Sequence, residues 1–338
     1  MDIDRLRYVV PVLKAFQGHP EAGKLWETMI VDILCNELGF TSTTHERNLY
    51  RGTIDDQLVL ICRQVDDFAI ATKSTATAEK LVAAINQRVT TTSAGIGVSG
   101  ASGMTSKYNG LDLHQTRDYI KINCETYISR VLQTHGWETP GVRESDRHDA
   151  VPMTAESADR ILHLDPGPAE GTPKNDALAA EDGFSFRKVL GELTYAYVLC
   201  RPNIGYATTL LSRYSTGPCK EHYVALKQIC KYLRGTRDWG IIYWRADPVG
   251  SLPAIAIRQP PDLDDSLGTF PLFGLHELVG FIDAAHGNDP RNRRSVTGFV
   301  FCYAGGAVAY KSKLQATVAT SSTEAEFIAG VHGGKTAK

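Results

Sequence analysis

The chain has 338 residues, which is too long for one ordinary hydrophobic core and suits two or three domains. Its composition, 43% hydrophobic and 22% charged, excludes a disordered or fibrous protein and is typical of a globular one. The formal net charge of -2 gives no overall attraction to a polyanion, so any contact with nucleic acid must come from local basic patches.

The first part of the chain carries both helix and strand signals. Apolar residues recur at helical spacing from Pro20 to Leu38, with Pro20 suited to the first turn and Gly39 to the end. The runs "QLVLICRQ" and "FAIAT" predict two strands joined by a tight turn, apolar enough to be buried on both faces. A helix over "STATAEKLVAAINQRV", a hairpin that turns near Thr116 and Arg117, and a helix over "ETYISRVLQTHG" are expected next.

In the middle and at the end of the chain, loop-like segments alternate with segments that predict helices or strands. Residues 138–182 are rich in Pro, Gly, Ser, Asp and Glu, so we predict a linker there. Residues 184–234 predict two or three helices, broken at "CRPN" and "TGPC", and residues 246–276 are again typical of a loop. The last of these helices is expected to carry an apolar stripe of Tyr223, Leu226, Cys230 and Leu233. Residues 277–338 predict a strand, a hairpin that turns at Gly305 and Gly306, and a helix that begins near "SSTEAEFIAG".

Two adjacent carboxylates, Asp66 and Asp67, interrupt the two apolar runs. A solvated turn is the usual explanation of an Asp pair at a hairpin tip, because Asp is a common turn residue. The flanking runs are apolar, however, so this tip is expected to extend from a packed core. Carboxylates held rigidly in this way favour a site for Mg²⁺, the ion that organises phosphates in nucleotidyl transfer.

Three blocks of sequence, in the same order, resemble the Pol polyprotein of copia-type LTR retrotransposons. The stretches "LKAFQGHPEAGKLWETMIVDILCNELGFTSTTHERNLY", "RQVDDFAIAT" and "YNGLDLHQTRDYIKINCETYISRVLQTHG" resemble its reverse transcriptase. The stretch "FRKVLGELTYAYVLCRPNIGYATTLLSRYSTGPCKEHYVALKQICKYLRGTRDWGIIY" is similar to the helical region between polymerase and RNase H. The stretch "GFIDAAHGNDPRNRRSVTGFVFCYAGGAVAYKSKLQATVATSSTEAEFIAG" resembles the start of the RNase H domain.

The resemblance implies an α+β chain with three structured parts. Residues 1–137 would be the C-terminal part of the reverse transcriptase fingers and palm, an antiparallel sheet with helices. Residues 183–245 would form a helical thumb and connection region, and residues 277–338 a truncated RNase H-like α/β domain. The linkers at 138–182 and 246–276 would separate these parts.

The resemblance also implies two catalytic centres that each depend on two Mg²⁺ ions. Asp66 would be the main metal ligand of the polymerase and Asp67 the ancillary one. Asp283 would be the first metal ligand of the RNase H centre, joined by a glutamate on the last helix. Both Glu324 and Glu326 fit a helix-capping box, and we assign capping to Glu324 and metal binding to Glu326.

Other residues are expected to contact substrate or nucleic acid. Gln17 and Gly18 match a turn that contacts template or incoming nucleotide in the family, although Gly18 and Pro20 also suffice to begin a helix. The basic side chains that would contact phosphates are Lys227, Lys231, Arg234, Arg237, Arg293 and Arg294. A solvated helix face is the alternative explanation for the first four.

The predicted function is that of a fragment of a retrotransposon reverse transcriptase with RNase H. Its expected partners are an RNA or DNA template-primer, deoxynucleoside triphosphates and, by self-association, a second copy of the chain. We expect the fragment to be inactive alone, because "MDIDRLRYVV" does not resemble the motif that brings the third polymerase carboxylate, and further RNase H ligands lie past Lys338 in the family. If it is active, Asp4 or Asp112 would complete the polymerase site.

Two alternatives stay open: a nucleic-acid-binding or assembly protein that kept the fold and lost catalysis, and a non-functional remnant. The compartment is predicted from simpler features. No apolar run is long enough to cross a membrane and no signal peptide is evident, so we expect an intracellular protein, cytoplasmic or nuclear. The seven scattered cysteines predict neither a disulfide framework nor a zinc site.

Overall fold

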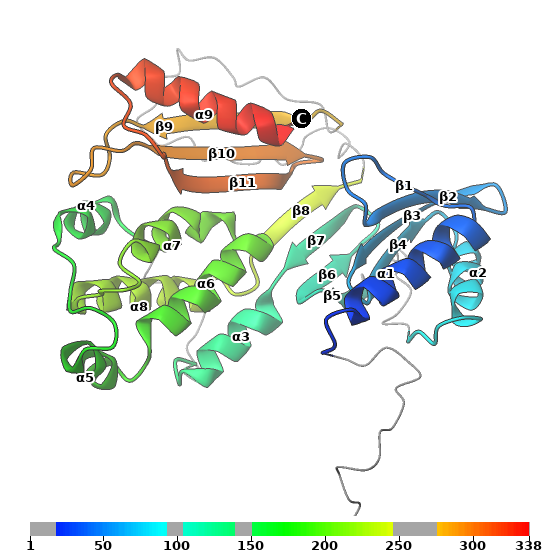
Figure 1. Cartoon of the computed structure of the whole chain (residues 1–338), viewed down its shortest axis with the longest axis horizontal. Helices are drawn as coiled ribbons and strands as arrows, with labels where there is room; N and C mark the ends of the chain where they lie inside the picture. Colours follow the sequence, from blue (N-terminus) through cyan, green and yellow to red (C-terminus); the bar gives the residue numbers. More distant parts are fainter. Residues whose placement is uncertain (1–17, 93–103, 139–150, 246–275, 338) are drawn as a thin grey trace, which may run out of the picture. The chain divides into compact units, whose positions relative to one another are not determined.

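The computed structural model describes residues 18–92, 104–138, 151–245 and 276–337 (Figure 1). The chain divides into two compact units, Met1–Val98 and Ser99–Lys338, called the first and second unit below. Both combine helices with antiparallel sheets. The α+β class is therefore confirmed at this level.

The first unit is a four-stranded sheet with helices on one face. Its strands run in the order β1-β2-β3-β4, and every neighbouring pair is antiparallel. The expected helix over 20–38 divides into an α-helix and a π-helix, and Gly39 follows it with a φ of 72°. The elements are α1 (Ala22–Val31), η1 (Asp32–Glu37), β1 (Thr41–Ser42), β2 (Leu49–Ile54), β3 (Gln57–Gln64), β4 (Asp67–Thr72) and α2 (Thr75–Asn86).

The core of the first unit lies on a single face of its sheet. Val59 and Ile61 of β3 are fully buried against side chains of α1, η1 and α2. Leu58 and Leu60 point to the other face, where each is 46% exposed. The expectation that these strands are buried on both faces is wrong, because both helices belong to the core on the same face.

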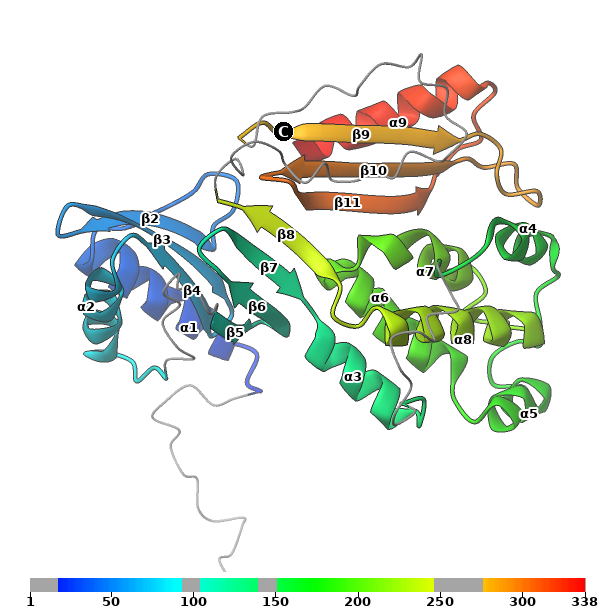
Figure 2. The same cartoon turned by 180° about the vertical axis from the view of Figure 1, so that it is seen from behind.

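The second unit contains two antiparallel sheets and a group of packed helices (Figure 2). One sheet has the order β5-β6-β7-β8, from strands β5 (Met104–Tyr108), β6 (Leu111–Gln115), β7 (Tyr119–Asn123) and β8 (Gly240–Trp244). The other has the order β11-β10-β9, from β9 (Val279–Ala285), β10 (Val296–Tyr303) and β11 (Gly306–Leu314). The helices are α3 (Glu125–Thr134), α4 (Ala155–His163), α5 (Pro173–Asp182), α6 (Phe186–Cys200), η3 (Pro202–Ile204), α7 (Gly205–Ser212), α8 (Lys220–Gly235) and α9 (Ser322–Ala337).

Two helices occupy part of the segment that was expected to be a linker. Helices α4 and α5 both lie within residues 138–182, and each begins with a threonine cap. Pro173 stands at the start of α5, and Gly183 ends it with a φ of 80°. The prediction of a linker is wrong over these helices, because the Pro and Gly residues mark helix boundaries there. The loop expected at 246–276 falls outside the described residues, except for His276.

Strand β8 was not expected, since the predicted helices ended at Arg234 and no strand was assigned to the rest of the region 183–245. It pairs antiparallel with β7, from Tyr119 opposite Trp244 to Asn123 opposite Gly240. Strand β8, which follows helices α3 to α8 in the chain, thus completes the sheet that begins with β5, β6 and β7. The boundary between the compact units accordingly falls after Val98 rather than at 137.

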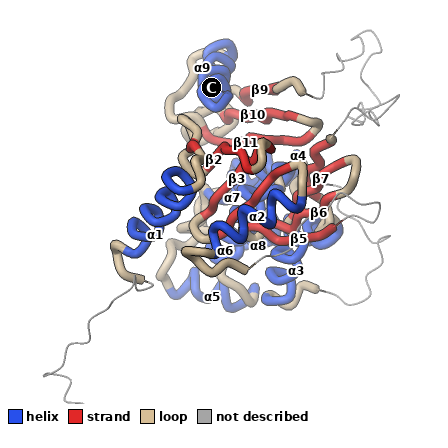
Figure 3. The backbone as a smooth tube through the Cα atoms, turned by 90° about the vertical axis from the view of Figure 1, so that its right-hand side faces the viewer, coloured by secondary structure: helices blue, strands red, loops and turns tan. Residues whose placement is uncertain are grey.

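The remaining predictions for the second unit agree with the structure. Helices α6, α7 and α8 are separated at the expected breaks, and the predicted apolar stripe of α8 is buried: Tyr223, Leu226, Cys230 and Leu233. The β10–β11 hairpin turns at Ala304 and Gly305, which both have positive φ, one residue before the predicted turn at Gly305 and Gly306. Helix α9 packs along β9 and β10 (Figure 3). Among the helices described, none has the length and apolar character needed to cross a bilayer.

Candidate metal-binding carboxylate sites

The Asp66–Asp67 pair lies at the tip of the β3–β4 hairpin, as predicted. Gln64 at the end of β3 pairs with Asp67 at the start of β4, which leaves Val65 and Asp66 as a two-residue turn. Val65 has a φ of 57°, the left-handed conformation found in tight hairpin turns. Both aspartates are exposed. Because its neighbour Phe68 packs against the helix-covered core, Asp67 lies on the opposite face.

Two donors hold the turn in place. The indole Nε1 of Trp26 on α1 donates to the carbonyl oxygen of Val65 at 2.7 Å, and Nη1 of Arg63 donates to the same oxygen at 3.3 Å. Arg63 is only 6% exposed, and its Nη2 donates to Oδ1 of Asn48 at 2.7 Å. We did not assign Trp26 or Arg63 this role from the sequence. The sequence signal for this role was the position of Arg63, which falls on the core-facing side of the alternating residues of β3.

A second acidic hairpin tip in the same sheet provides an internal comparison. Asp55 and Asp56 form the β2–β3 turn with φ values of 50° and 58°. The carboxylate of Asp55 forms an ion pair with Lys80 of α2. By contrast, no hydrogen bond or ion pair to another described residue engages the side chains of Asp66 and Asp67. The predicted metal site is thus the tip whose carboxylates have no ion-pair partner among the described residues.

The chemistry of this tip suits Mg²⁺, but its carboxylates supply only part of a coordination shell. Carboxylate oxygens are the ligands that this hard ion prefers, and it normally takes six. Over the ranges that the structure describes, no group of three or more His, Cys, Asp or Glu side chains is arranged to hold a metal ion. Asp4 and Gln17 fall outside those ranges, whereas Gly18 is described, with a φ of 92°.

Asp112, considered as a further polymerase ligand, is engaged elsewhere. Its two carboxylate oxygens accept hydrogen bonds from the backbone N–H and the hydroxyl of Thr126, each at 2.8 Å. The side chain is buried at the start of α3, where it satisfies a backbone donor of the first helical turn. Asp112 is therefore a helix-capping residue in this structure.

The second pair of predicted metal ligands comes from β9 and α9. Asp283 is an exposed residue of β9. Oε1 of Glu326 accepts a hydrogen bond from the backbone N–H of Ala284, the residue after Asp283, at 3.3 Å. Helix α9 approaches the strand through small buried residues, among them Ala325 and Ala329. Glu326 therefore lies beside the strand that carries Asp283, as the sequence predicted.

Glu324, two residues earlier on the same helix, has a different role. Its Oε2 accepts hydrogen bonds from the backbone N–H and the hydroxyl of Thr320, each at 2.7 Å. The hydrogen bonds from Thr320 hold the pKa of Glu324 below its ordinary value. The assignment of capping to Glu324, with Glu326 facing the strand, is thus confirmed. Metal binding by Asp283 and Glu326 stays a prediction.

Some of the basic side chains predicted to contact phosphates already have acidic partners. Nζ of Lys227 lies 2.8 Å from Oδ1 of Asp182, and Nη1 of Arg237 lies 2.9 Å from Oε1 of Glu138. A phosphate would have to compete with these carboxylates. Lys231 is exposed on α8. Phosphate contact stays a prediction for all six residues.

Two of these six, Arg293 and Arg294, lie in the turn between β9 and β10, and Arg293 is exposed. The centre of that turn is Asp289, whose buried carboxylate accepts a hydrogen bond from Nη1 of Arg213 at 3.3 Å. The backbone N–H of Arg291 donates to the same carboxylate at 3.0 Å. The turn is thereby fixed to the C-terminal end of α7.

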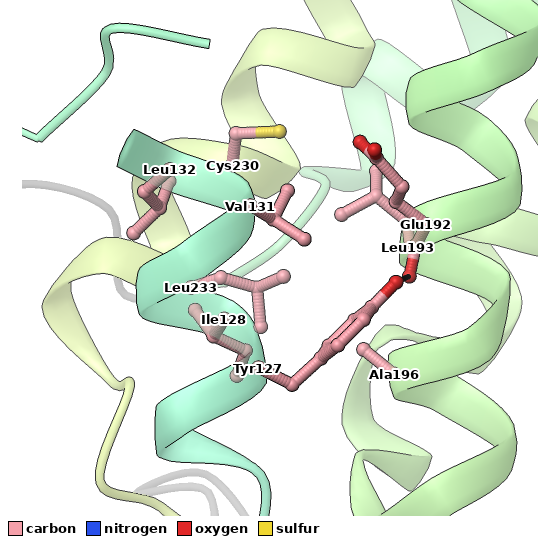
Figure 4. A pocket seen from close by; sticks show the side chains of 9 residues that line it. All are labelled: Tyr127, Ile128, Val131, Leu132, Glu192, Leu193, Ala196, Cys230 and Leu233. Carbon is pink, nitrogen blue, oxygen red and sulfur yellow. Dashed lines mark hydrogen bonds between the residues drawn. The ribbon is translucent and has the colours of Figure 1, made fainter. Parts of the chain in front are cut away.

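The cavity enclosed by α3, α6 and α8 is too small to bind a substrate (Figure 4). Its volume is about 10 Å³, enough for roughly one water molecule. The hydroxyl of Tyr127 on its wall donates to the backbone oxygen of Glu192 at 3.1 Å. The cavity is a small packing gap in the helical core.

Replacing Arg63 with methionine is expected to destabilise the hairpin tip. The change removes the donors to Val65 and Asn48, which should lower the free energy of unfolding by about 2 kcal/mol. Urea unfolding followed by circular dichroism measures this loss. Arg51→Met, at an exposed position of β2 in the same sheet, is the matched control and should cost less than about 0.5 kcal/mol. Equal losses in the two variants would contradict the role of Arg63.

Comparison with known proteins agrees with the resemblance seen in the sequence. Residues 3–140 match the reverse transcriptase (RNA-dependent DNA polymerase) family, a range that contains the β3–β4 hairpin. The chain is 36% identical over 150 residues to the retrovirus-related Pol polyprotein from transposon TNT 1-94 of Nicotiana tabacum. It is also 23% identical over 323 residues to the putative transposon Ty5-1 protein of Saccharomyces cerevisiae. These matches are consistent with a copia-type retrotransposon Pol protein.

The coverage of these relatives differs widely. The match to the tobacco protein spans 44% of this Pol chain but only 9% of that polyprotein. The match to the yeast protein spans 95% of the Pol chain and 87% of its relative. Secreted RxLR effector protein 161 of Plasmopara viticola is 33% identical over 144 residues, which is 43% of the Pol chain and 82% of the effector. No solved structure matches the chain significantly.

Proposed function

We propose that this Pol chain contributes part of the catalytic centre of a retrotransposon reverse transcriptase. The observation that carries the proposal is a pair of exposed carboxylates on a hairpin tip, with no ion-pair partner among the described residues, inside the range that matches the reverse transcriptase family. Asp66 would be the main ligand of the catalytic metal and Asp67 the ancillary one. Bound Mg²⁺ would stabilise the charge that develops as a primer hydroxyl attacks a nucleotide phosphate.

The architecture supports a finer assignment of the parts. The first unit would be palm, with Trp26 and Arg63 keeping the metal-binding tip rigid while Asp67 faces away from the helices. The helices from α6 to α8 would form the thumb and connection. The β9–β11 sheet with α9 would be the start of an RNase H-like domain, in which Asp283 and Glu326 hold metal.

The proposed partners follow from the same assignment. A template-primer would contact Lys231, Arg293 and Arg294 through its phosphates, with Lys227, Arg234 and Arg237 engaged only if their present partners release them. The incoming nucleotide or the template would contact the turn at Gln17 and Gly18. Self-association with a second copy of the chain is part of the proposal and is measured by light scattering.

Binding of Mn²⁺ tests the metal site without requiring activity. An Asp283→Asn background removes a ligand of the other proposed site, so that electron paramagnetic resonance reports mainly on the hairpin. In this background, Asp66→Asn is expected to weaken Mn²⁺ binding about tenfold or more, because it removes a direct carboxylate ligand. Asp67→Asn should have a smaller effect in the same direction.

The control for this experiment is Asp55→Asn, at the acidic tip that Lys80 already neutralises. It adds the same change of charge to the same sheet and should leave Mn²⁺ binding within about twofold of the background, since screening weakens distant surface charges. An equal loss in Asp55→Asn and Asp66→Asn would show a diffuse charge effect. That result would contradict a metal site at the β3–β4 tip.

A further inference from the structure

An open groove in the second unit is lined by residues of both of its sheets and of the C-terminal end of α6. Its volume is about 490 Å³, inside the range of roughly 300–1,000 Å³ that is usual for small-molecule sites. Ile122 and Ile241 line it from the β5–β8 sheet, and Val308 and Tyr310 line it from β11. None of its lining residues belongs to either proposed metal site, so the groove is a separate candidate site.

Hydrogen bonds hold the aromatic walls of the groove in place. The hydroxyl of Tyr243 on β8 donates to the carbonyl oxygen of Ala307 at 2.6 Å. The hydroxyl of Tyr310 donates to the carbonyl oxygen of Tyr197 on α6 at 2.9 Å, and the hydroxyl of Tyr197 accepts from the backbone N–H of Ser312 at 3.0 Å. Because these bonds tie β8 and α6 to β11, the tyrosines need no rearrangement to accept a ligand. Their hydroxyls are occupied, which leaves the ring surfaces for contact.

Two valines on the walls of the groove are exposed to solvent. Val198 on α6 is 67% exposed, and Val308 on β11 is 49% exposed. Apolar side chains that gather at the surface of a groove are typical of a binding site, because a ligand removes them from water. Phe299 of β10 adds a further aromatic side chain to the lining. The ligand that suits these walls has a planar and largely apolar body, since aromatic rings pack well on one another.

The charge of the groove comes from Lys311 of β11. This exposed lysine lines the groove and forms no hydrogen bond or ion pair with another described residue. No aspartate or glutamate is among the lining residues that the structure describes. An ammonium group beside apolar walls attracts an anion more strongly than one in open water, because apolar surroundings lower the local dielectric constant. The groove thus combines aromatic, apolar walls with a single positive charge.

We propose that the groove binds a small aromatic anion, a molecule with a planar ring system and one carboxylate or sulfonate group. Its rings would pack on Tyr310 and on the two valines, and its anionic group would accept a hydrogen bond from Nζ of Lys311. A neutral molecule of the same shape would lack this charge-assisted bond and bind more weakly. A cation of the same shape would be repelled by Lys311.

Such a ligand would contact both sheets and α6 at once, so it should stabilise the second unit. A ligand that binds only the folded state raises the free energy of unfolding once its concentration exceeds its Kd. The Tm measured by circular dichroism should therefore rise by about 5 °C when the ligand is present at about one hundred times its Kd.

Fluorescence titration of the full 338-residue chain with anilinonaphthalene sulfonate tests the proposal, because this probe is an aromatic anion that brightens in apolar surroundings. The expected result is one saturable site. Lys311→Met should weaken binding about tenfold, the effect of losing one charge-assisted hydrogen bond. Lys313→Met is the matched control: Lys313 is exposed on the same strand but does not line the groove, so this variant should stay within about twofold of the unaltered chain.

An uncharged probe of similar shape, phenylnaphthylamine, separates the charge from the apolar walls. It should bind the unaltered chain more weakly than the sulfonate does. Its affinity should be the same, within about twofold, for Lys311→Met and for the unaltered chain, because it makes no bond to the ammonium group.

A pair of valine variants tests the walls. Val308→Asp places a carboxylate in the groove and should weaken binding of the sulfonate about tenfold or more. Val318→Asp is its matched control, since Val318 is 50% exposed and lies outside the groove. Circular dichroism reports whether each variant is folded; if Val308→Asp does not fold, the two lysine variants decide. Equal affinities of Lys311→Met and Lys313→Met for the sulfonate, or the lack of a saturable site in the unaltered chain, would overturn the proposal.

Discussion

Purified residues 1–338 are expected to extend a primed RNA template at least about 10⁴-fold more slowly than an intact copia-type polymerase, the scale of loss seen when a catalytic group is removed. Two-metal catalysis needs enough carboxylates to hold both ions. The hairpin tip provides two carboxylates, Asp66 and Asp67. The carboxylate of Asp112 already accepts hydrogen bonds from Thr126. Extension of a fluorescent primer with Mg²⁺ or Mn²⁺ measures the rate, and a labelled RNA–DNA hybrid measures RNase H cleavage, which we expect to be absent.

The Asp66→Asn variant is the control that shows whether any remaining primer extension depends on the proposed metal site. If the chain is inactive, this variant should cause no further loss. Extension that Asp66→Asn abolishes, and that Asp55→Asn preserves, would show the expectation of inactivity to be wrong. The missing ligand would then be sought outside the described residues, with Asp4 as the first candidate. Salt-dependent binding of template-primer without incorporation would instead support a nucleic-acid-binding protein that has lost catalysis.

The free energy of unfolding of the second unit is expected to fall by about 3 kcal/mol between pH 6.5 and pH 4 because a single buried histidine, His222, becomes protonated on unfolding. His222 is fully buried, and its Nδ1 accepts a hydrogen bond from the backbone N–H of Cys219 at 2.9 Å. Burial lowers the pKa of His222 to about 4. The unfolded chain takes up this proton near pH 6.5 and the folded chain only near pH 4, so acid favours unfolding within that window. Above pH 6.5 the contribution does not change.

Urea unfolding at pH 7, 5.5 and 4.5 measures this dependence. His222→Gln removes the titrating group, so its stability should vary less with pH than that of the unaltered chain. His163→Gln, which replaces an exposed histidine on α4, is the matched control and should keep the full dependence. Carboxylates also titrate in this range, so the difference between the two variants is the decisive quantity. An unchanged slope in His222→Gln would refute the assignment.

The β3–β4 hairpin tip shows how much of the candidate site the local sequence predicts. A two-residue turn between apolar strands is a short-range feature, because the backbone of Val65 and Asp66 is restricted by its immediate neighbours. The same reasoning predicted the apolar stripe of α8 and placed the β10–β11 turn within one residue of its position. Sequence did not distinguish the Asp66 tip from the tip at Asp55. That distinction depends on Lys80, which reaches Asp55 from a helix that follows both hairpins.

The sequence by itself determined most of the local elements and, through three colinear blocks, the resemblance to copia-type Pol proteins. Tertiary structure alone decided that β8 returns to pair with β7 and that one face of β3 stays exposed. The physical reason is the range of the interactions. Turns and helix caps are decided within a few residues, whereas burial and strand pairing depend on which distant segment returns to satisfy a sheet edge or cover an apolar face.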